Sequence, residues 1–130
     1  MAARIREICV NCSDPEVMAA FWSAALDYPV IDRDDESVSI MGPADRPSFL
    51  FIRTDVDRGG PPKAGPNRFH IDLSPTGCDQ ATEVARLEQL GAVRIDIGQG
   101  TPSWVVMADP EGNEFCVLRT QVPPEGQPFE

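Results

Sequence analysis

His70 is the only histidine in the chain, and it lies in the stretch NRFHIDL at positions 67–73. Apolar and polar residues alternate in this stretch, as they do in a strand with one buried face. On such a strand His70 and Asp72 point to the same side. An imidazole in this position can bind a metal, move a proton or simply lie half-exposed as a polar residue. Asp72 could orient the imidazole in the first two roles.

The two halves of the chain match in residue type and spacing. The stretch EICV beginning at Glu7 aligns with HIDL beginning at His70, and SFLFIR at Ser48 aligns with EFCVLR at Glu114. The offsets of 63 and 66 residues are longer than solenoid units and indicate one duplicated unit. In a pseudo-twofold pair of units, equivalent positions meet near the axis. We therefore expect Glu7, Ser48, His70 and Glu114 to converge there.

Three of these residues carry groups that can do chemistry. Two carboxylates and one imidazole can bind a divalent cation such as Zn, Fe, Mn or Ni. Three protein ligands leave coordination positions open for water and substrate. If no metal binds, the carboxylates remain candidates for proton transfer. The sequence thus predicts Glu7, His70 and Glu114 as metal ligands, and Glu7 and Glu114 as catalytic residues.

The same strand faces predict the walls of a substrate pocket. Side-chain alternation puts Leu50 beside Ser48 and Cys116 beside Glu114. Trp104 follows GQGTPS and begins a strand, so it is a candidate for the mouth of a pocket. The predicted pocket residues are Trp104, Ser48, Leu50, Asp72 and Cys116.

Short strands must hold these side chains in place. The pattern of apolar residues predicts strands at 5–11, 37–41, 48–53, 68–74, 93–97, 103–108 and 114–119. On the first strand, Ile8 and Val10 are expected to face the buried side. The turn DPEGN at 109–113 has its glycine placed for positive φ.

Two helices are predicted between the strands. The first begins at SDPE, where Ser13 and Glu16 can form a capping box and Asp14 before Pro15 is an alternative N-cap. It should stop near Asp27. The second spans 79–90 and ends at a glycine. Its predicted buried residues are Ala81, Val84, Ala85, Leu87 and Leu90.

The chain of 130 residues is about the length of one domain. Gly, Pro and charged residues concentrate at 54–67, which is predicted to link a first module at 4–53 to a second at 68–120. The remaining residues, 121–130, are expected to form a tail that is mobile from 123 onward.

Composition excludes several classes of partner. The net charge of −10 argues against nucleic acid and against anionic membranes, since both need a basic surface. The sequence holds no apolar run long enough to span a membrane, and its first residues lack the features of a secretory signal. The expected location is therefore cytoplasmic. Cys9 and Cys12 form a CxxC pattern, but Cys9 lies in a strand-like run, which favours packed, reduced thiols over a redox or zinc pair.

Four stretches resemble the glyoxalase / bleomycin-resistance / dioxygenase superfamily, also called the vicinal oxygen chelate superfamily. They are SDPEVMAAFWSAALDYPV, NRFHIDL, EQLGA and WVVMADPEGNEFCVL. The resemblance covers about residues 4–120 and is strongest to small bacterial glyoxalase-like proteins. It implies an α+β fold of two βαβββ modules in a pseudo-twofold arrangement. Their mixed, curved sheets would surround a cleft, with the helices outside.

The resemblance also implies where a metal would bind. The family's ligand positions fall on Glu7, Ser48, His70 and Glu114. His70 and Glu114 match the family pattern, whereas Glu7 replaces the usual His or Gln. Ser48 replaces the carboxylate of glyoxalase I. Because dioxygenases and fosfomycin-resistance enzymes usually have two histidines, the chain fits neither class, and it departs from glyoxalase I as well.

Two functions follow from this resemblance. One is a metal-assisted lyase or isomerase that moves a proton on a small oxygenated substrate. The other is a non-catalytic, bleomycin-resistance type of protein that binds a small molecule between Trp104, Leu50 and Leu118. Family members often dimerise, so a homodimer is also expected.

Overall fold

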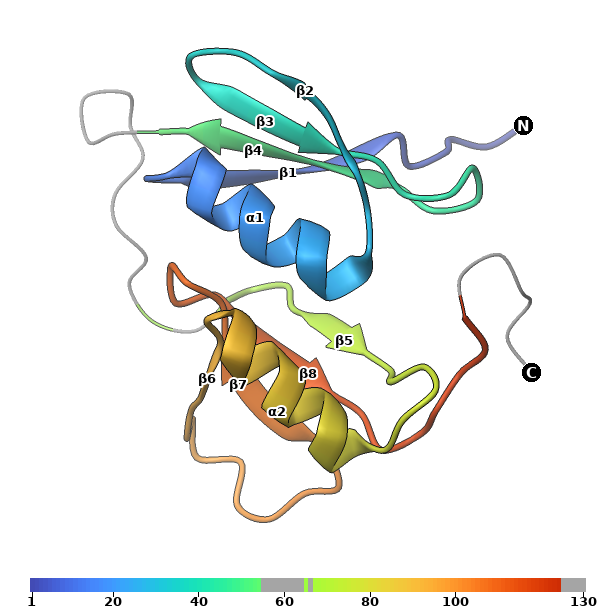
Figure 1. The fold of residues 1–130 in the computed structure, drawn as a ribbon, viewed down its shortest axis with the longest axis vertical. Coiled ribbons are helices and arrows are strands. Elements are labelled where there is room, and N and C mark those ends of the chain that lie inside the picture. The colour runs from blue at the N-terminus through green and yellow to red at the C-terminus, as the bar shows by residue number, and fades with distance from the viewer. Residues whose placement is uncertain (55–64, 66, 125–130) are drawn as a thin grey trace. The chain divides into compact units, whose positions relative to one another are not determined.

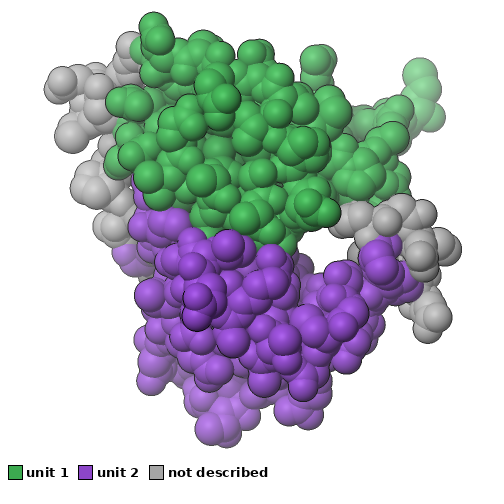
Figure 2. Space-filling view, viewed as in Figure 1, with its two compact units in different colours: residues 1–62 green, residues 63–130 purple. Residues whose placement is uncertain are grey.

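The computed structural model describes residues 1–54, 65 and 67–124. Most of the predicted linker at 54–67 and most of the predicted tail lie outside the described residues. The chain divides into two compact units, residues 1–62 and 63–130, and each unit contains one predicted module (Figure 2).

The first unit is a four-stranded mixed sheet with one helix. Its elements are β1 (Glu7–Cys12), α1 (Pro15–Leu26), β2 (Val30–Arg33), β3 (Ser37–Ile40) and β4 (Ser48–Arg53), as labelled in Figure 1. The strand order is β1-β4-β3-β2, with β1 parallel to β4 and the other neighbours antiparallel. Helix α1 packs against β3 and β4.

The second unit repeats this arrangement. Its elements are β5 (Ile71–Leu73), α2 (Gln80–Leu90), β6 (Val93–Arg94), β7 (Val105–Ala108) and β8 (Glu114–Val117). The strand order is β5-β8-β7-β6, with β5 parallel to β8, and α2 packs against β6 and β8. The chain is therefore an α+β protein of two βαβββ modules, as predicted.

The register of the parallel pairs confirms the predicted repeat. Ile8 pairs with Phe49 in the first unit, and Ile71 pairs with Phe115 in the second. These four residues are related by the same offsets, 63 and 66, that relate the two halves of the sequence. The duplication thus extends to the strand register.

Both helices begin and end at capping residues. The carboxylate of Asp14 accepts hydrogen bonds from the N–H groups of Glu16 and Val17, so Asp14 is the N-cap of α1 and Pro15 occupies N1. Asp27 ends this helix with φ 57°. In α2, Asp79 caps the first turn and Gly91 ends the helix. The helix limits were predicted correctly, with Asp14 rather than Ser13 as the first cap.

The buried faces of β1 and α2 were predicted only in part. Ile8 is 38% exposed, because β1 is an edge strand and α1 packs over β3 and β4. In α2, Val84 and Leu87 are fully buried, whereas Ala81 and Ala85 are exposed and Leu90 is half-buried.

Glu83 in α2 is buried although it is charged. Its side chain forms two hydrogen bonds with the Arg86 guanidinium, at 2.7 and 2.9 Å. A paired carboxylate with a long stem can cover apolar surface that an alanine cannot reach. The sequence pattern did not reveal this pairing.

The sequence pattern missed β2 and overestimated the length of several strands, most of all those predicted at 68–74 and 93–97. All four residues of β2 are exposed and its pairing with β3 is irregular, so apolar residues do not alternate along it. The predicted strand 93–97 ends at Arg94, since the Asp96 carboxylate accepts the Gly98 N–H and forms a turn. The predicted strand 68–74 shortens to β5.

Candidate functional site

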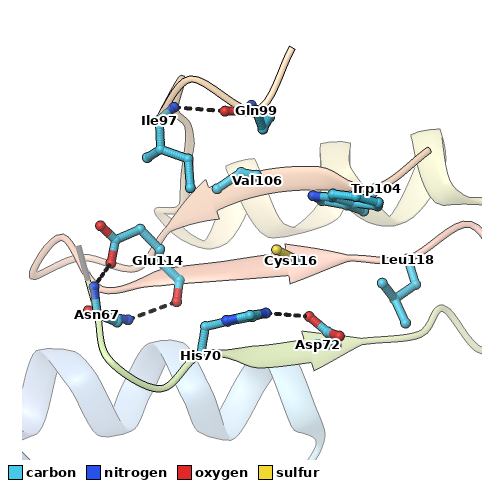
Figure 3. Close-up of a pocket in the computed structure, with 10 residues that line it drawn as sticks. All are labelled: Asn67, His70, Asp72, Ile97, Gln99, Trp104, Val106, Glu114, Cys116 and Leu118. Carbon is cyan, nitrogen blue, oxygen red and sulfur yellow. Dashed lines mark hydrogen bonds and ion pairs between the residues drawn. The ribbon is translucent and has the colours of Figure 1, made fainter. Parts of the chain in front are cut away.

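The second unit contains a pocket of about 370 Å³, a volume within the range of small-molecule sites. We call it the second-unit pocket (Figure 3). It is lined by Asn67, His70, Asp72, Ile97, Gln99, Trp104, Val106, Glu114, Cys116 and Leu118.

Three adjacent strands form one wall of this pocket. Asp72 on β5 pairs with Cys116 on β8, and Cys116 pairs with Val106 on β7. Residues in register on neighbouring strands point to the same side of a sheet, so these three side chains form a row. Their neighbours in sequence, Phe115 and Val117, point to the other side and are buried in the core.

His70 and Asp72 lie close together at one side of the pocket. His70 Nε2 lies 3.1 Å from Asp72 Oδ1, and the two side chains are 54% and 49% exposed. Figure 3 shows the imidazole and the carboxylate pointing toward each other along β5. The role of Asp72 in orienting the imidazole stays a prediction, and this contact is the geometry that such a role requires.

Cys116 completes a cluster with these two residues. One ligand atom from each of His70, Asp72 and Cys116 lies within 4.8 Å of the others. Burial raises the pKa of the Cys116 thiol, and the charge of Asp72 and a hydrogen bond to its carboxylate raise it further. In the absence of a cation beside it, the Cys116 thiol therefore stays protonated at neutral pH.

Glu114 lines the same pocket but makes its contacts with Asn67. Its Oε2 accepts the Asn67 N–H at 3.0 Å, and the Asn67 side-chain amide donates to the Glu114 carbonyl at 3.0 Å. These bonds join the segment before β5 to the start of β8. They hold the chain on which His70 lies against its neighbouring strand.

The remaining predicted residues belong to the first unit. Glu7 pairs with Ser48, and Cys9 pairs with Leu50, across the parallel strands β1 and β4. Cys9 Sγ donates a long hydrogen bond of 3.9 Å to Glu7 Oε2. Slight burial and the Glu7 carboxylate raise the pKa of the Cys9 thiol. Since Glu7 lies in the other unit, the three-ligand set of Glu7, His70 and Glu114 stays a prediction.

Sequence reasoning missed four residues of the second-unit pocket: Asn67, Ile97, Gln99 and Val106. Val106 lies two residues after Trp104, so side-chain alternation could have found it. Ile97 and Gln99 come from an irregular segment whose shape depends on the hydrogen bond from the Ile97 N–H to Gln99 Oε1, at 2.8 Å. Asn67 fell within the predicted linker.

The fold and the sequence define the class of protein. Residues 7–118 match the family described as a glyoxalase-like domain. The chain belongs to this family, and thereby to the glyoxalase / bleomycin-resistance / dioxygenase superfamily that its motifs resemble. No curated protein matches the sequence.

Several solved structures share the fold of this chain. A glyoxalase/bleomycin resistance protein/dioxygenase family enzyme from Burkholderia phytofirmans is 17% identical with a TM-score of 0.63, covering 88% of this chain and 97% of that chain. A hypothetical protein from S. aureus is 16% identical with a TM-score of 0.65, covering 92% and 96%. A fosfomycin resistance protein from Mesorhizobium loti is 13% identical with a TM-score of 0.63, covering 93% and 94%. Identities this low establish the fold alone.

Superfamily membership gives a broad expectation for ligands. Members of this superfamily bind small molecules, commonly use divalent metals and often dimerise. Within the described part of this chain, no helix is long and apolar enough to cross a membrane.

Proposed function

We propose that the protein acts on a small oxygenated molecule bound in the second-unit pocket, by proton transfer of the lyase or isomerase type. One observation carries this proposal. Four apolar side chains, Ile97, Trp104, Val106 and Leu118, line a pocket in which His70, Asp72 and Cys116 are clustered. Apolar walls with a few convergent polar groups are typical of sites that bind and orient a small molecule.

Each group has a role that follows from its chemistry. The apolar walls would exclude water from the carbon skeleton of the substrate, and Trp104 offers a ring that is 45% exposed for stacking against it. His70 would take or give the proton, because an imidazole is the side chain that most often serves as a general acid or base. Asp72, at 3.1 Å, would hold the imidazole in one orientation.

A divalent metal is compatible with this chemistry. When bound, it would polarise a substrate oxygen and so favour loss of a neighbouring proton. The imidazole, carboxylate and thiol groups that cluster in the pocket all belong to the usual metal-binding side chains. The predicted set of Glu7, His70 and Glu114 remains a proposal, as do the homodimer and the cytoplasmic location.

A non-catalytic binding protein is the second candidate. It is supported by the apolar side chains of Ile97, Val106 and Leu118 and by the exposed ring of Trp104. The net charge of −10 would favour a cationic ligand over an anionic one. In this case the pocket would hold its ligand without changing it.

Deuterium exchange separates the two candidates whatever the final product of the reaction is. Small hydroxy-ketones and hydroxy-acids would be incubated with the protein in D₂O, and NMR would follow exchange of the hydrogen next to the carbonyl. We expect catalysed exchange that is lost in His70→Gln and reduced in Asp72→Asn. Glu88→Gln, a change on the exposed face of α2, is the matched control and should exchange normally.

Binding is measured on the same compounds. Trp22 is 4% exposed and Trp104 is 45% exposed, so a ligand in the pocket should quench mainly Trp104 fluorescence. Quenching without exchange supports the binding protein. Exchange or binding that persists in Val106→Trp, which would fill the pocket, would contradict both candidates.

A further inference from the structure

We infer that His70, Asp72 and Cys116 form a divalent-metal site contained within the second unit, with the Cys116 sulfur as one of its ligands. This inference rests on the proposed function, since the site lies in the same pocket, and it names the cofactor and the residues that hold it. With a metal bound, His70 and Asp72 would serve as its ligands, and the proton transfer would fall to Glu114, a predicted catalytic residue that lines the same pocket. It differs from the predicted set of Glu7, His70 and Glu114, which contains no sulfur.

The strand register brings the three donors together. Asp72 on β5 and Cys116 on β8 are paired residues of adjacent parallel strands, and His70 lies two residues before Asp72, on the same side. The donor atoms of a tetrahedral zinc site, with bonds of about 2.0–2.3 Å, lie about 3–4 Å apart. The 3.1 Å contact between His70 and Asp72 already has this separation, and the whole cluster lies within 4.8 Å.

The donor types select the kind of metal. A nitrogen, an oxygen and a sulfur ligand suit zinc or cobalt(II), whereas magnesium and calcium prefer sites made of oxygen alone. Three protein ligands also leave at least one coordination position open. The cluster therefore favours a thiophilic metal with room for one substrate atom or water.

The surroundings of Cys116 suit a metal-bound sulfur. Cys116 is 9% exposed, and its paired neighbour Val106 is 2% exposed, so few water molecules can reach the thiol. Low-dielectric surroundings would strengthen the attraction between a thiolate and a cation, so a bound metal would offset the cost of burying a charged sulfur. Metal binding would displace the thiol proton, as it does for cysteine ligands in general.

The first unit offers a natural control. Cys9 also lies near a carboxylate, with Sγ 3.9 Å from Glu7 Oε2, and both thiols have a raised pKa. Cys9 belongs to the first unit, whereas His70, the only histidine of the chain, belongs to the second. A signal that requires Cys116 but not Cys9 would thus report on this cluster rather than on any thiol–carboxylate pair.

Cobalt(II) titration tests the inference on the full-length, tag-free, reduced protein. We expect about one ion per chain, a sulfur-to-cobalt charge-transfer band and the visible bands of a tetrahedral site. Cys116→Ser should remove the charge-transfer band. His70→Gln and Asp72→Asn should each weaken cobalt affinity by about 10–100-fold or more, since loss of a residue that merely hydrogen-bonds to a metal ligand already has an effect of this size. Cys9→Ser should leave both the band and the affinity unchanged.

X-ray absorption at the cobalt edge of the unaltered protein gives a second measurement that does not depend on the folding of a variant. We expect one sulfur neighbour. Cobalt with only nitrogen and oxygen neighbours would overturn the inference, as would binding that is lost in Glu114→Gln or Glu7→Gln but kept in Cys116→Ser.

The outcomes also separate this inference from the proposed function. If the protein binds no cobalt but still exchanges substrate hydrogen or binds a compound near Trp104, the metal site is refuted and the pocket is retained. If the protein binds cobalt through Cys116 but neither binds any compound nor exchanges its hydrogen, the proposed function is refuted and the metal site is retained.

Discussion

The two units have the same scaffold but carry different chemical groups. Both have one parallel and two antiparallel strand pairs, in the same order and the same register. At equivalent positions of the parallel pair, the first unit has Cys9 opposite Leu50, whereas the second has Asp72 opposite Cys116. These side chains point away from the core, so they can differ without changing the fold. The scaffold sets the positions, and the substitutions on one face decide which chemical groups each unit presents there.

The cores of the two units also differ in composition. In the first unit, Phe49 stacks with Trp22 and with Phe51, with ring centroids 6.4 and 6.3 Å apart. In the second unit, the buried core is mainly aliphatic and Phe115 is its buried aromatic residue among those described. Aromatic contacts should therefore stabilise the first unit more than the second.

The largest expected effect tests this difference in the cores. Phe51 and Val117 occupy equivalent strand positions, and both are fully buried. Phe51→Ala should lower the free energy of unfolding by about 3–5 kcal/mol through lost burial and a cavity. Val117→Ala should lower the free energy of unfolding by about 1–3 kcal/mol, because this substitution removes fewer buried carbon atoms. Urea denaturation measures both, and equal losses would contradict the comparison.

An intermediate loss of stability is expected from a substitution in the turn after β7. After β7, the Asp109 carboxylate accepts the N–H groups of Glu111 and Asn113 at 3.0 Å, and Asp109 is 4% exposed. Asp109→Ala would leave these donors without that acceptor and should cost about 1–3 kcal/mol. Asp109→Asn keeps one acceptor oxygen and should cost less. Thermal denaturation of the two variants measures this order, and its reversal would count against the role of the carboxylate.

In the turn after β3, packing accounts for a glycine at position 42. A Cβ added at Gly42 would lie 2.7 Å from Cε2 of the Tyr28 ring, and Tyr28 is buried. In the second unit, the turn glycine is Gly112, whose φ of 88° favours glycine for its backbone instead. The two turns therefore require glycine for different reasons.

The smallest expected effect concerns pH. Hydrogen bonding from Thr82 at the start of α2 lowers the pKa of Asp79 in the folded protein. The cap therefore stabilises the fold above the unfolded carboxyl pKa of about 3.9, and this contribution is lost as the pH falls through the folded pKa. Asp79→Ala should lower Tm at neutral pH, and the difference should shrink in acid. A difference that stays constant from neutral to strongly acidic pH would exclude a charged cap.

The sequence by itself was sufficient for the scaffold. Alternating apolar residues and capping signals located both helices and seven of the strands, because these patterns depend on local geometry and on one buried face. The offsets of 63 and 66 residues revealed the duplication, since equivalent strands keep equivalent residues. The single histidine and its neighbour Asp72 could be selected as candidates for the same reason.

Only the tertiary structure decided which groups meet. Asp72 and Cys116 are far apart in the chain and become neighbours through the β5–β8 register, which no local pattern specifies. The contact between Asn67 and Glu114 and the irregular strand β2 likewise depend on long-range pairing. A local pattern determines which face a side chain occupies, but strand pairing determines which other side chains share that face.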